Sequence, residues 1–207
     1  MDRLLLVRHG QTPWNAEKIL QGQADIELSE RGREQAQHLK PLLAKWLPDR
    51  AVCSDLQRAR QTAQLLGWGK AAPDARWREA DLGDWTAQPM QALIASDGER
   101  YQRWRDGIDA PPRGEAMDQF RARIAAAIQS LAGLQGNVLV VTHGGVIRAA
   151  LSLLLGLTAE RIVLSLELVD GRRARPLPDD ARVSWLRIEP RMEHGALPPQ
   201  AERTPTY

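Results

Sequence analysis

The chain has 207 residues, of which 43% are hydrophobic and 26% charged, and this size is typical of one domain or two small ones. Its formal net charge of +2 does not favour nucleic acid as a partner, and no apolar run approaches the roughly 18 residues of a membrane span. A single cysteine excludes an internal disulfide, and the start of the chain lacks the pattern of a signal peptide, so we expect a cytoplasmic protein.

The first predicted element is a buried strand over residues 4–7, where four apolar residues follow one another. Arg8 and His9 come directly after it, and Gly10 and Pro13 break the pattern and begin a turn. Arg8 and His9 are therefore expected at the carboxyl end of a central strand, where open α/β sheets bind their ligands. An imidazole beside a permanently charged guanidinium is difficult to bury unless an anion lies between them.

A polar loop over residues 21–29 follows, and Ser29 is expected to cap a helix that extends to about Trp46. Apolar residues recur on one face of this helix, which is typical of packing against a core. Pro41 lies inside the span and is expected to kink the helix or split it. Residues 51–53 are then a candidate for a short strand.

The next predicted helix begins at Ser54, because a serine followed three residues later by Gln57 makes a capping box. It is expected to extend to about Leu66 and to end at Gly67. Arg58 lies in its first turns, close to the end of a helix that attracts anions. The alternative is that Arg58 makes an ordinary structural salt bridge.

The middle of the chain is less regular. Residues 67–78 show no clear period, and residues 88–116 are polar and contain tryptophan, so we expect the latter to form a helical cap over the site. Residues 117–134 are the clearest amphipathic helix, because apolar side chains recur at steps of three and four. This stripe is expected to pack in the core.

A second apolar run, residues 138–141, ends like the first, because His143 and Gly144 follow soon after it and an apolar, helix-like segment comes next. Two parallel strands would bring His9 and His143 to one edge of the same sheet. A lone histidine is usually structural. Two histidines at equivalent strand ends, each followed by glycine, favour a shared functional site.

Beyond this segment, residues 164–168 and 183–188 alternate in polarity and are expected to form two strands joined by a charged hairpin loop. Residues 190–207 are proline-rich and polar, and we expect a poorly ordered tail. The two remaining histidines, His38 on a helix surface and His194 in the tail, are assigned no role.

The sequence Arg8-His9-Gly10-x-Thr12-x-x-Asn15 resembles the signature of the histidine phosphatase superfamily, in its phosphoglycerate-mutase-like branch. The resemblance covers residues 3 to about 188 and rests on separate motifs in the expected order. Two of the others are Leu28-Ser29-Glu30-Arg31-Gly32-x-x-Gln35-Ala36 and Ser54-x-Leu56-x-Arg58-Ala59-x-x-Thr62-Ala63. The resemblance implies an α/β fold, a three-layer α/β/α sandwich with a mainly parallel central sheet and a small helical cap. One domain would occupy residues 1–189, with the cap inserted at about 80–116 and the tail at 190–207.

The resemblance also implies that Glu79 supplies the catalytic acid, because it lies four residues before Gly83 and an aromatic residue, Trp85, follows. Asp81 is the nearest rival and would be the acid if the register of this loop were different. Residues 86–87 are Thr-Ala where the family usually has Glu-Gly, a departure that affects part of the substrate wall.

Two further features of the cap stretch are left open by the sequence. Gly114 and Glu115 resemble the Gly-Glu-Ser of the family, with Ala116 in place of serine, so Glu115 is either a solvated loop residue or a functional one. Arg113 and the basic residues within 98–106 are candidates for holding a second anion.

The chemistry that the resemblance implies begins with a neutral imidazole at His9, which attacks phosphorus and forms a phosphohistidine. An unperturbed histidine has a pKa of about 6.5, and the guanidiniums of Arg8 and Arg58 would disfavour its protonated form. Arg8 and Arg58 would also hold the phosphoryl oxygens, and His143 would stabilise their charge during transfer.

Other residues would assist this reaction. Asn15 would donate a hydrogen bond to the phosphate or orient the nucleophile, and Gly144 would offer backbone amides at the start of a helix. Glu79 would protonate the leaving oxygen and then take a proton from the attacking water. Gln21 and Gly22, on the polar loop, are expected to contact the substrate.

The sequence therefore predicts a metal-independent phosphomonoesterase that acts on a small phosphorylated metabolite through a phosphohistidine. No metal or other cofactor is expected, because arginine side chains neutralise the phosphate. A phosphoglycerate-type mutase is the main alternative, disfavoured by the compact cap, and a non-catalytic phospholigand-binding protein is a weaker one. Neither nucleic acid nor a membrane is expected as a partner. A homodimer stays open, as does the natural substrate, from sugar phosphates and phosphoglycerate-type acids to α-ribazole phosphate.

Two other phosphatase chemistries fit less well. A cysteine phosphatase needs five residues, glycines among them, between its cysteine and its arginine, whereas four residues without glycine separate Cys53 from Arg58. Cys53 is more typical of a buried strand residue. A dinuclear metal hydrolase would need aspartates or a His-x-His pair near His9 and His143, and the sequence has neither.

Overall fold

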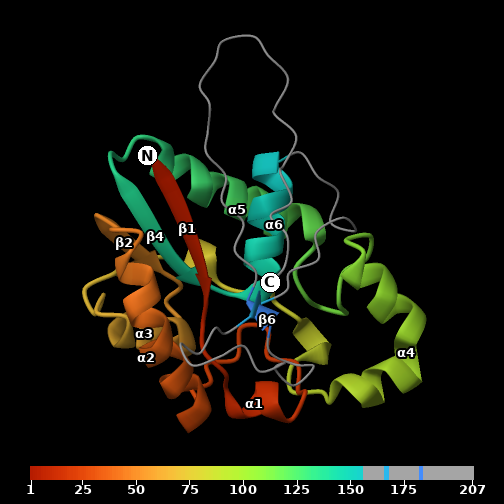
Figure 1. Ribbon diagram of the computed structural model, residues 1–207. Helices are drawn as coiled ribbons and strands as arrows, with labels where there is room; N and C mark the ends of the chain where they lie inside the picture. Colours follow the sequence, from red (N-terminus) through yellow and green to blue (C-terminus); the bar gives the residue numbers. More distant parts are fainter. Residues whose placement is uncertain (156–165, 168–181, 184–207) are drawn as a thin grey trace.

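The computed structural model describes residues 1–155, 166–167 and 182–183 of the chain. Four parallel strands form its main sheet, in the order β1-β4-β2-β3 (Figure 1). They are β1 (Arg3–Arg8), β2 (Arg50–Cys53), β3 (Ala72–Pro73) and β4 (Asn137–Thr142). The strands predicted at residues 4–7, 51–53 and 138–141 are therefore confirmed. The short β3 lies in a stretch whose sequence has no strand periodicity.

Helices connect the strands and cover both faces of the sheet. They are α1 (Pro13–Ala16), α2 (Glu30–Ala44), α3 (Gln57–Leu65), α4 (Met90–Arg105), α5 (Met117–Ala132) and α6 (Gly144–Leu155). Two short 3-10 helices lie between β3 and α4, namely η1 (Ala75–Trp77) and η2 (Gly83–Trp85). The mixture of parallel strands and connecting helices gives the α/β fold that the sequence predicts.

The strand β4 divides the core into two clusters, because its side chains alternate between the faces of the sheet. Val138 and Val140 belong to the cluster that includes buried residues of α5 and α6, while Leu139 and Val141 belong to the cluster with α2 and α3. All four side chains are fully buried. Figure 1 shows the two pairs of helices on opposite sides of β1 and β4, which gives the three predicted layers.

Helix α2 begins as predicted, because the Ser29 hydroxyl accepts a hydrogen bond from the Gly32 amide at 3.1 Å. Pro41 lies in the last turn, and the helix continues past it to Ala44 instead of splitting. A proline removes one backbone hydrogen bond from a helix. Burial of Leu43 in the core stabilises the turn in which that bond is missing.

Helix α3 begins at Gln57, so the prediction of a start capped by Ser54 is wrong. The amide of Gln57 donates instead to the carboxylate of Asp25 at 2.7 Å. The Ser54 hydroxyl forms a hydrogen bond with Nε2 of the His143 ring. The other end of the helix agrees with the prediction, since Gly67 follows it with a positive φ of 94°.

Helix α4 lies to one side of the sheet (Figure 1). Non-helical backbone at Asp97 divides it into two parts. The second part joins the rest of the fold by aromatic packing, because the rings of Tyr101 and Trp104 lie 6.0 and 5.7 Å from the ring of Trp85. A helix is therefore present within residues 88–116, as expected.

The last described elements agree with the sequence in part. Helix α5 covers most of the predicted span of residues 117–134. The strands β5 (Leu166–Glu167) and β6 (Arg182–Val183) pair antiparallel and overlap the two predicted strands. The hairpin loop between them and the tail predicted at 190–207 lie outside the described residues.

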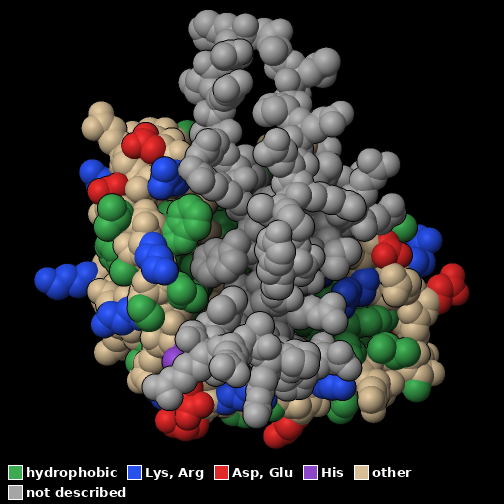
Figure 2. All heavy atoms as spheres, viewed as in Figure 1, with side chains coloured by type: hydrophobic (Ala, Val, Ile, Leu, Met, Phe, Trp, Pro, Cys, Tyr) green, Lys and Arg blue, Asp and Glu red, His purple; other side chains and the backbone are tan. Residues whose placement is uncertain are grey.

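The surface of the described part carries charges of both signs. Figure 2 shows Lys and Arg side chains interspersed with Asp and Glu along the visible edges of one face. This distribution agrees with a formal net charge of only +2. None of the helices in the described part is both long and apolar enough to cross a membrane.

Candidate active site

The parallel strands β1 and β4 bring His9 and His143 to the same edge of the sheet. Their register pairs Arg8 with Thr142, and the His9 amide donates to the Thr142 carbonyl at 2.9 Å. The two imidazole rings lie 5.1 Å apart between centroids and are inclined by 60°. Both residues are buried, with 8% of His9 and none of His143 exposed.

The turn after β1 fixes the orientation of the His9 ring. The Gly10 amide donates to the Thr62 hydroxyl at 3.1 Å, and a Cβ at Gly10 would come within 2.3 Å of the Gly32 carbonyl oxygen. The ring nitrogen Nδ1 of His9 lies 2.7 Å from the Gly10 carbonyl oxygen. Because a carbonyl only accepts, Nδ1 carries the proton in the neutral ring, and Nε2 keeps a lone pair.

The hydrogen bonds of His143 fix the opposite tautomer. Its Nδ1 accepts from Nε of Arg58 at 3.3 Å, and a guanidinium has no lone pair with which to accept in return. The proton of the neutral ring is therefore on Nε2, which donates to the Ser54 hydroxyl at 2.8 Å. Sequence reasoning missed this role of Ser54. The available signal was its position directly after β2, at the sheet edge that also carries the two histidines.

Both imidazoles are neutral in this environment. Burial holds the pKa of His9 well below its ordinary value, and the charges of Arg8 and Arg58 lower it further. Burial likewise holds the pKa of His143 well below the usual range, with smaller effects from His9 and Arg58. The sequence suggested this direction for His9 from the guanidiniums alone, whereas burial is the larger cause.

Arg58 is a buried anchor of the polar loop between α1 and α2. Its side chain lies at the start of α3, is 1% exposed, and donates to the Gly22 carbonyl at 2.7 Å and to the Ala24 carbonyl at 2.6 Å. Burial lowers its pKa to about 10, so the guanidinium stays charged at neutral pH. Arg58 thus binds backbone carbonyls, whereas the alternative for it was a structural salt bridge.

A cavity of about 860 Å³ opens beside His9. Eight of the nine residues predicted for the site line it, namely Arg8, His9, Asn15, Gln21, Gly22, Arg58, Glu79 and Gly144. The ninth, His143, is not among the lining residues, because it is fully buried against Arg58 and Ser54. The structure therefore gives His143 no direct contact with the cavity.

The Glu79 carboxylate is held at the beginning of α6. It accepts hydrogen bonds from the Gly145 amide and from the Ala80 amide, each at 3.0 Å. A Cβ at residue 145 would come within 2.3 Å of a carboxylate oxygen of Glu79, so a larger residue there would displace the carboxylate from this position. The rival Asp81 is exposed, caps the Gly83 amide at 2.9 Å and does not line the cavity. The geometry thus favours Glu79 over Asp81 as the acid.

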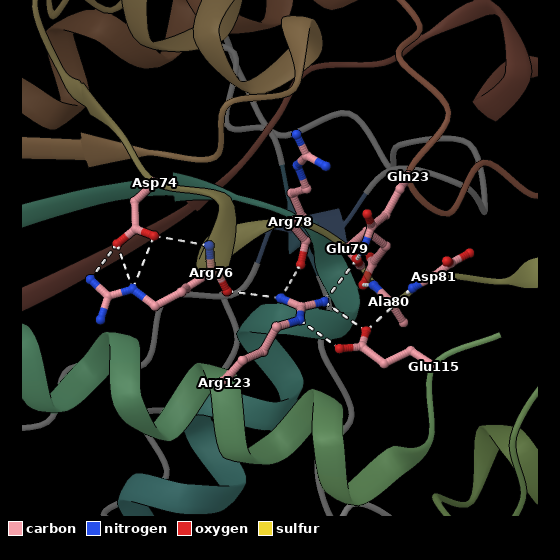
Figure 3. A network of polar contacts seen from close by, with 9 residues as sticks. All are labelled: Gln23, Asp74, Arg76, Arg78, Glu79, Ala80, Asp81, Glu115 and Arg123. Carbon is pink, nitrogen blue, oxygen red and sulfur yellow. Dashed lines mark hydrogen bonds and ion pairs between the residues drawn. The ribbon is translucent and has the colours of Figure 1, made fainter.

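Arg123 on α5 holds the segment that carries Glu79 (Figure 3). Its Nη1 donates to the carbonyls of Arg76 and Arg78 at 2.8 and 2.7 Å, and its Nη2 donates to the Glu79 carbonyl at 2.9 Å. The carboxylate of Glu115 accepts the other two N–H groups at 2.7 and 2.8 Å. Glu115 is therefore neither a solvated loop residue nor part of the cavity wall, but the ion-pair partner of Arg123.

The basic residues proposed for a second anion are only partly at the cavity. Arg113 is exposed, pairs with the Asp84 carboxylate and does not line the cavity, so that expectation is wrong for Arg113. Arg105, from the 98–106 cluster, does line it. Arg121 and Arg148 line it as well, and sequence reasoning did not single them out.

The rival chemistries find no support in this geometry. Cys53 is buried in β2, and burial raises the pKa of its thiol, which suits packing and not nucleophilic attack. Among the residues that the structure describes, no group of three His, Cys, Asp or Glu side chains could hold a metal ion.

Comparison with known proteins identifies the family. The family model of the histidine phosphatase superfamily (branch 1) matches residues 4–169. A glucosyl-3-phosphoglycerate phosphatase from Mycolicibacterium vanbaalenii is 40% identical over 172 residues, which cover 76% of each chain. An adenosylcobalamin/alpha-ribazole phosphatase from Escherichia coli is 36% identical over 165 residues, which cover 76% of this chain and 81% of that one.

Solved structures agree with this assignment. The mycobacterial glucosyl-3-phosphoglycerate phosphatase in complex with VO3 superposes with a TM-score of 0.71 at 36% identity. The match covers 77% of this chain and 84% of that chain. The resemblance in the sequence is thus matched by a shared fold. The chain belongs to the histidine phosphatase superfamily, branch 1, and is a phosphoric monoester hydrolase.

Proposed function

We propose that this phosphatase is a metal-independent phosphomonoesterase that transfers the phosphoryl group of a small metabolite to His9 and then to water. The observation that carries the proposal is the state of the His9 ring. Its Nδ1 is held by the Gly10 carbonyl, burial lowers its pKa, and it lines the cavity beside Arg8. Nucleophilic attack on phosphorus requires a neutral imidazole with an unprotonated nitrogen, here Nε2.

In the first step the ester binds with its phosphoryl oxygens against Arg8 and Arg58. Each terminal nitrogen of Arg58 uses one of its two N–H groups to bind a carbonyl of the loop. The second N–H group of each nitrogen would donate to the phosphoryl oxygens. The side-chain oxygen of Asn15 is engaged by Thr12, so its NH2 group remains to donate to phosphate. The bond from Nε2 to phosphorus forms as the bond to the leaving oxygen breaks, and protonated Glu79 gives its proton to that oxygen.

In the second step water attacks phosphorus and the bond to Nε2 of His9 breaks. The Glu79 carboxylate takes the proton of that water, and inorganic phosphate leaves. The Gly145 amide supports this role, because its hydrogen bond holds the carboxylate in place. Arginine side chains neutralise the phosphoryl charge throughout, so no metal ion is needed for it.

His143 contributes to this mechanism chiefly through Arg58. Its Nδ1 accepts from Nε of Arg58, which holds the guanidinium beside the phosphoryl site. Ser54 accepts the Nε2–H of His143 and so maintains the tautomer that makes this contact. Since both ring nitrogens are engaged by Arg58 and Ser54, the neutral ring would support the phosphoryl site through Arg58 and not by a direct contact with the phosphoryl oxygens.

The walls of the cavity support a small metabolite as the substrate. Met90, Tyr101 and Trp104 of α4 line it, so residues 80–116 would act as the cap. Gln21 is buried, and within the described part of the chain its Oε1 has no hydrogen-bond partner, so it is placed to accept a substrate hydroxyl. The names of the relatives, glucosyl-3-phosphoglycerate phosphatase and adenosylcobalamin/alpha-ribazole phosphatase, support the same substrate class.

Hydrolysis of p-nitrophenyl phosphate by the full chain, with and without EDTA, tests this function. We expect phosphate release that EDTA does not reduce and that needs no bisphosphate primer. Loss of activity in EDTA would contradict a metal-independent reaction, and dependence on a primer would indicate a mutase. Failure to hydrolyse this ester or any member of a panel of sugar and glycerol phosphates would indicate a binding protein.

A further inference from the structure

An ion pair between Arg78 and Asp55 joins the segment that carries Glu79 to the turn before helix α3. Nε of Arg78 donates to one carboxylate oxygen of Asp55 at 2.7 Å, and Nη2 donates to the other at 2.6 Å. Two parallel hydrogen bonds of this kind fix the relative orientation of a guanidinium and a carboxylate as well as their distance. The two residues are 23 positions apart in the sequence, so the pair connects two separate parts of the fold.

Each partner of this ion pair is the direct neighbour of a residue of the proposed site. Arg78 precedes Glu79, the proposed proton donor. Asp55 follows Ser54, whose hydroxyl accepts a hydrogen bond from the ring of His143. The ion pair therefore connects the segment of the proton donor to the turn that supports the phosphoryl site.

The backbone at Arg78 allows the ion pair to control the direction of the next side chain. Arg78 has an extended conformation, with φ −63° and ψ 153°. Successive side chains of an extended chain point to different sides, so those of Arg78 and Glu79 leave the segment in different directions. Figure 3 shows the Arg78 guanidinium on the side of the segment away from Arg123, while the Arg78 carbonyl accepts from Arg123. The ion pair thus holds the segment from the side opposite to α5.

Both members of the ion pair are charged at neutral pH and partly exposed to water. The hydrogen bonds from Arg78 hold the pKa of Asp55 below its ordinary value, and the same bonds raise the pKa of Arg78. The Arg78 side chain is 37% exposed and that of Asp55 is 27% exposed. An ion pair in contact with water contributes little to the free energy of unfolding. A role in positioning can therefore be separated from a role in folding.

We propose that the ion pair between Arg78 and Asp55 positions Glu79 relative to the phosphoryl group, so that both partners are positioning residues for proton transfer. This inference rests on the proposed function, in which Glu79 protonates the leaving oxygen. A proton donor must lie within hydrogen-bond reach of that oxygen, and a displacement of about 1 Å can lower the rate about a hundredfold. Without the ion pair, the segment would keep its contacts with α5 but lose its connection to the turn at Ser54.

A second ion pair in the same stretch of the chain provides a matched control. Arg76 and Asp74 form it, with Nη2 of Arg76 2.7 Å from a carboxylate oxygen and side chains that are 43% and 20% exposed. Arg76 also donates to the Ser130 hydroxyl on α5 at 3.1 Å. This pair joins residues only two positions apart, and neither of them lines the cavity.

The variants D55N and D74N test the inference, because each removes one carboxylate charge from one of these pairs and keeps the size of the side chain. The first substrate is the sugar or glycerol phosphate that the wild type hydrolyses fastest, and its leaving oxygen needs a proton. The second is p-nitrophenyl phosphate, whose leaving group needs none. In D55N we expect kcat/KM to fall at least about tenfold for the first ester and clearly less for the second. In D74N we expect the ratio of the two values to equal that of the wild type.

A double-mutant cycle shows whether the effect belongs to the ion pair. The variant R78Q removes the same interaction from the other side, so the ratio of kcat/KM for the two esters in D55N/R78Q should equal that in either single variant. If the two effects multiply in the double variant, the residues do not act as a pair and the inference is overturned. If D55N does not fold, R78Q is compared with D74N and the wild type, and failure of both single variants to fold would show that the pair is needed for folding and overturn the inference.

The outcomes separate this inference from the function on which it rests. Equal losses for both esters in D55N, no loss, or the same change of ratio in D74N would overturn the inference while the phosphatase function stands. The variant E79Q should lower the ratio at least as much as D55N, and an unchanged ratio in E79Q would contradict the proposed role of Glu79 itself. If the wild type hydrolyses neither p-nitrophenyl phosphate nor any of the metabolites, the phosphatase function fails.

Discussion

Single hydrogen bonds decide which nitrogen of each catalytic-site imidazole carries a proton. The Gly10 carbonyl places the His9 proton on Nδ1, while Arg58 and Ser54 place the His143 proton on Nε2. The two neighbouring rings therefore have opposite tautomers, which suits the proposed roles of His9 as a nucleophile and of His143 as a support for the Arg58 guanidinium.

The lowered pKa of His9 leads to a prediction about pH. Because burial lowers this pKa in the folded state, the neutral nucleophile should persist as the pH falls through about 6.5, where half of an unperturbed histidine is protonated. The unfolded chain binds that proton more readily, so the free energy of unfolding should decrease as the pH falls below about 6.5 towards the folded-state pKa. NMR titration of labelled histidine, with H9Q to assign the signal, measures the first effect, and urea unfolding at several pH values measures the second.

One result of the NMR titration would contradict this prediction. A His9 ring that titrates at or above its ordinary pKa would mean that the folded protein does not bury it as the structure shows. The nucleophile would then be largely protonated in mildly acidic solution, and the proposed attack would be confined to higher pH.

At the residue scale, the sequence predicts the participants in the site better than their partners. Arg8 and His9 follow a continuous apolar run, a local pattern that directly indicates a strand end. The partner of Ser54 is 89 residues away in the sequence, and its local context, with Gln57 three residues on, favours a helix cap. Local chemistry of the chain cannot distinguish these two uses of one hydroxyl.

At the scale of elements, Arg123 joins α5 to the segment that extends from η1 to Glu79. The five N–H groups of Arg123 all have acceptors, namely the carboxylate of Glu115 and the backbone carbonyls of Arg76, Arg78 and Glu79 (Figure 3). A fully satisfied, largely buried guanidinium fixes the backbone to which it donates. Arg123 is thus a positioning residue for Glu79.

The variant R123K tests this positioning role. A lysine ammonium is a point charge with three donors and cannot replace the five donors of the guanidinium, so the Glu79 loop should loosen. We expect kcat/KM to fall about tenfold or more for an alkyl phosphate, whose leaving group needs a proton, and clearly less for p-nitrophenyl phosphate. The control is R103K, because Arg103 pairs with Asp109 on the exposed surface of the cap stretch.

Equal losses for both esters in R123K would argue against the role of Arg123 in positioning the acid. A purely structural defect should reduce the amount of folded enzyme, and so lower both rates by the same factor. Circular dichroism of the two variants shows whether such a defect is present.

At the scale of elements, the sequence also predicts the main strands, because their apolar runs are short, continuous and bounded by turn residues. The start of α3 was not predictable, since the Asp25 carboxylate that accepts from its first amide comes from a distant loop. Pro41 illustrates the same limit, because core packing of Leu43 keeps the last turn of α2 helical.

For the whole molecule, the sheet order explains why the site lies where it does. β1 and β4 are adjacent and parallel, so the residues that follow them meet at one edge, although more than a hundred residues separate them. The cavity beside this edge is closed by residues of α4, α5 and α6. The convergence of the two histidines was predictable from two similar local patterns. That Nε of Arg148 is buried without a hydrogen-bond partner among the described residues was not predictable, because it depends on every described element around it.

The central claim is that His9 carries the phosphoryl group between the two steps, and the phosphorylated enzyme tests it most directly. The full chain is mixed rapidly with a 32P-labelled phosphate monoester, denatured in alkali within milliseconds, and digested to locate the label. We predict up to one phosphoryl group per chain on Nε2 of His9, and none in the variant H9Q. A wild-type enzyme that turns over while its label lies on another residue, or on none, would contradict the account.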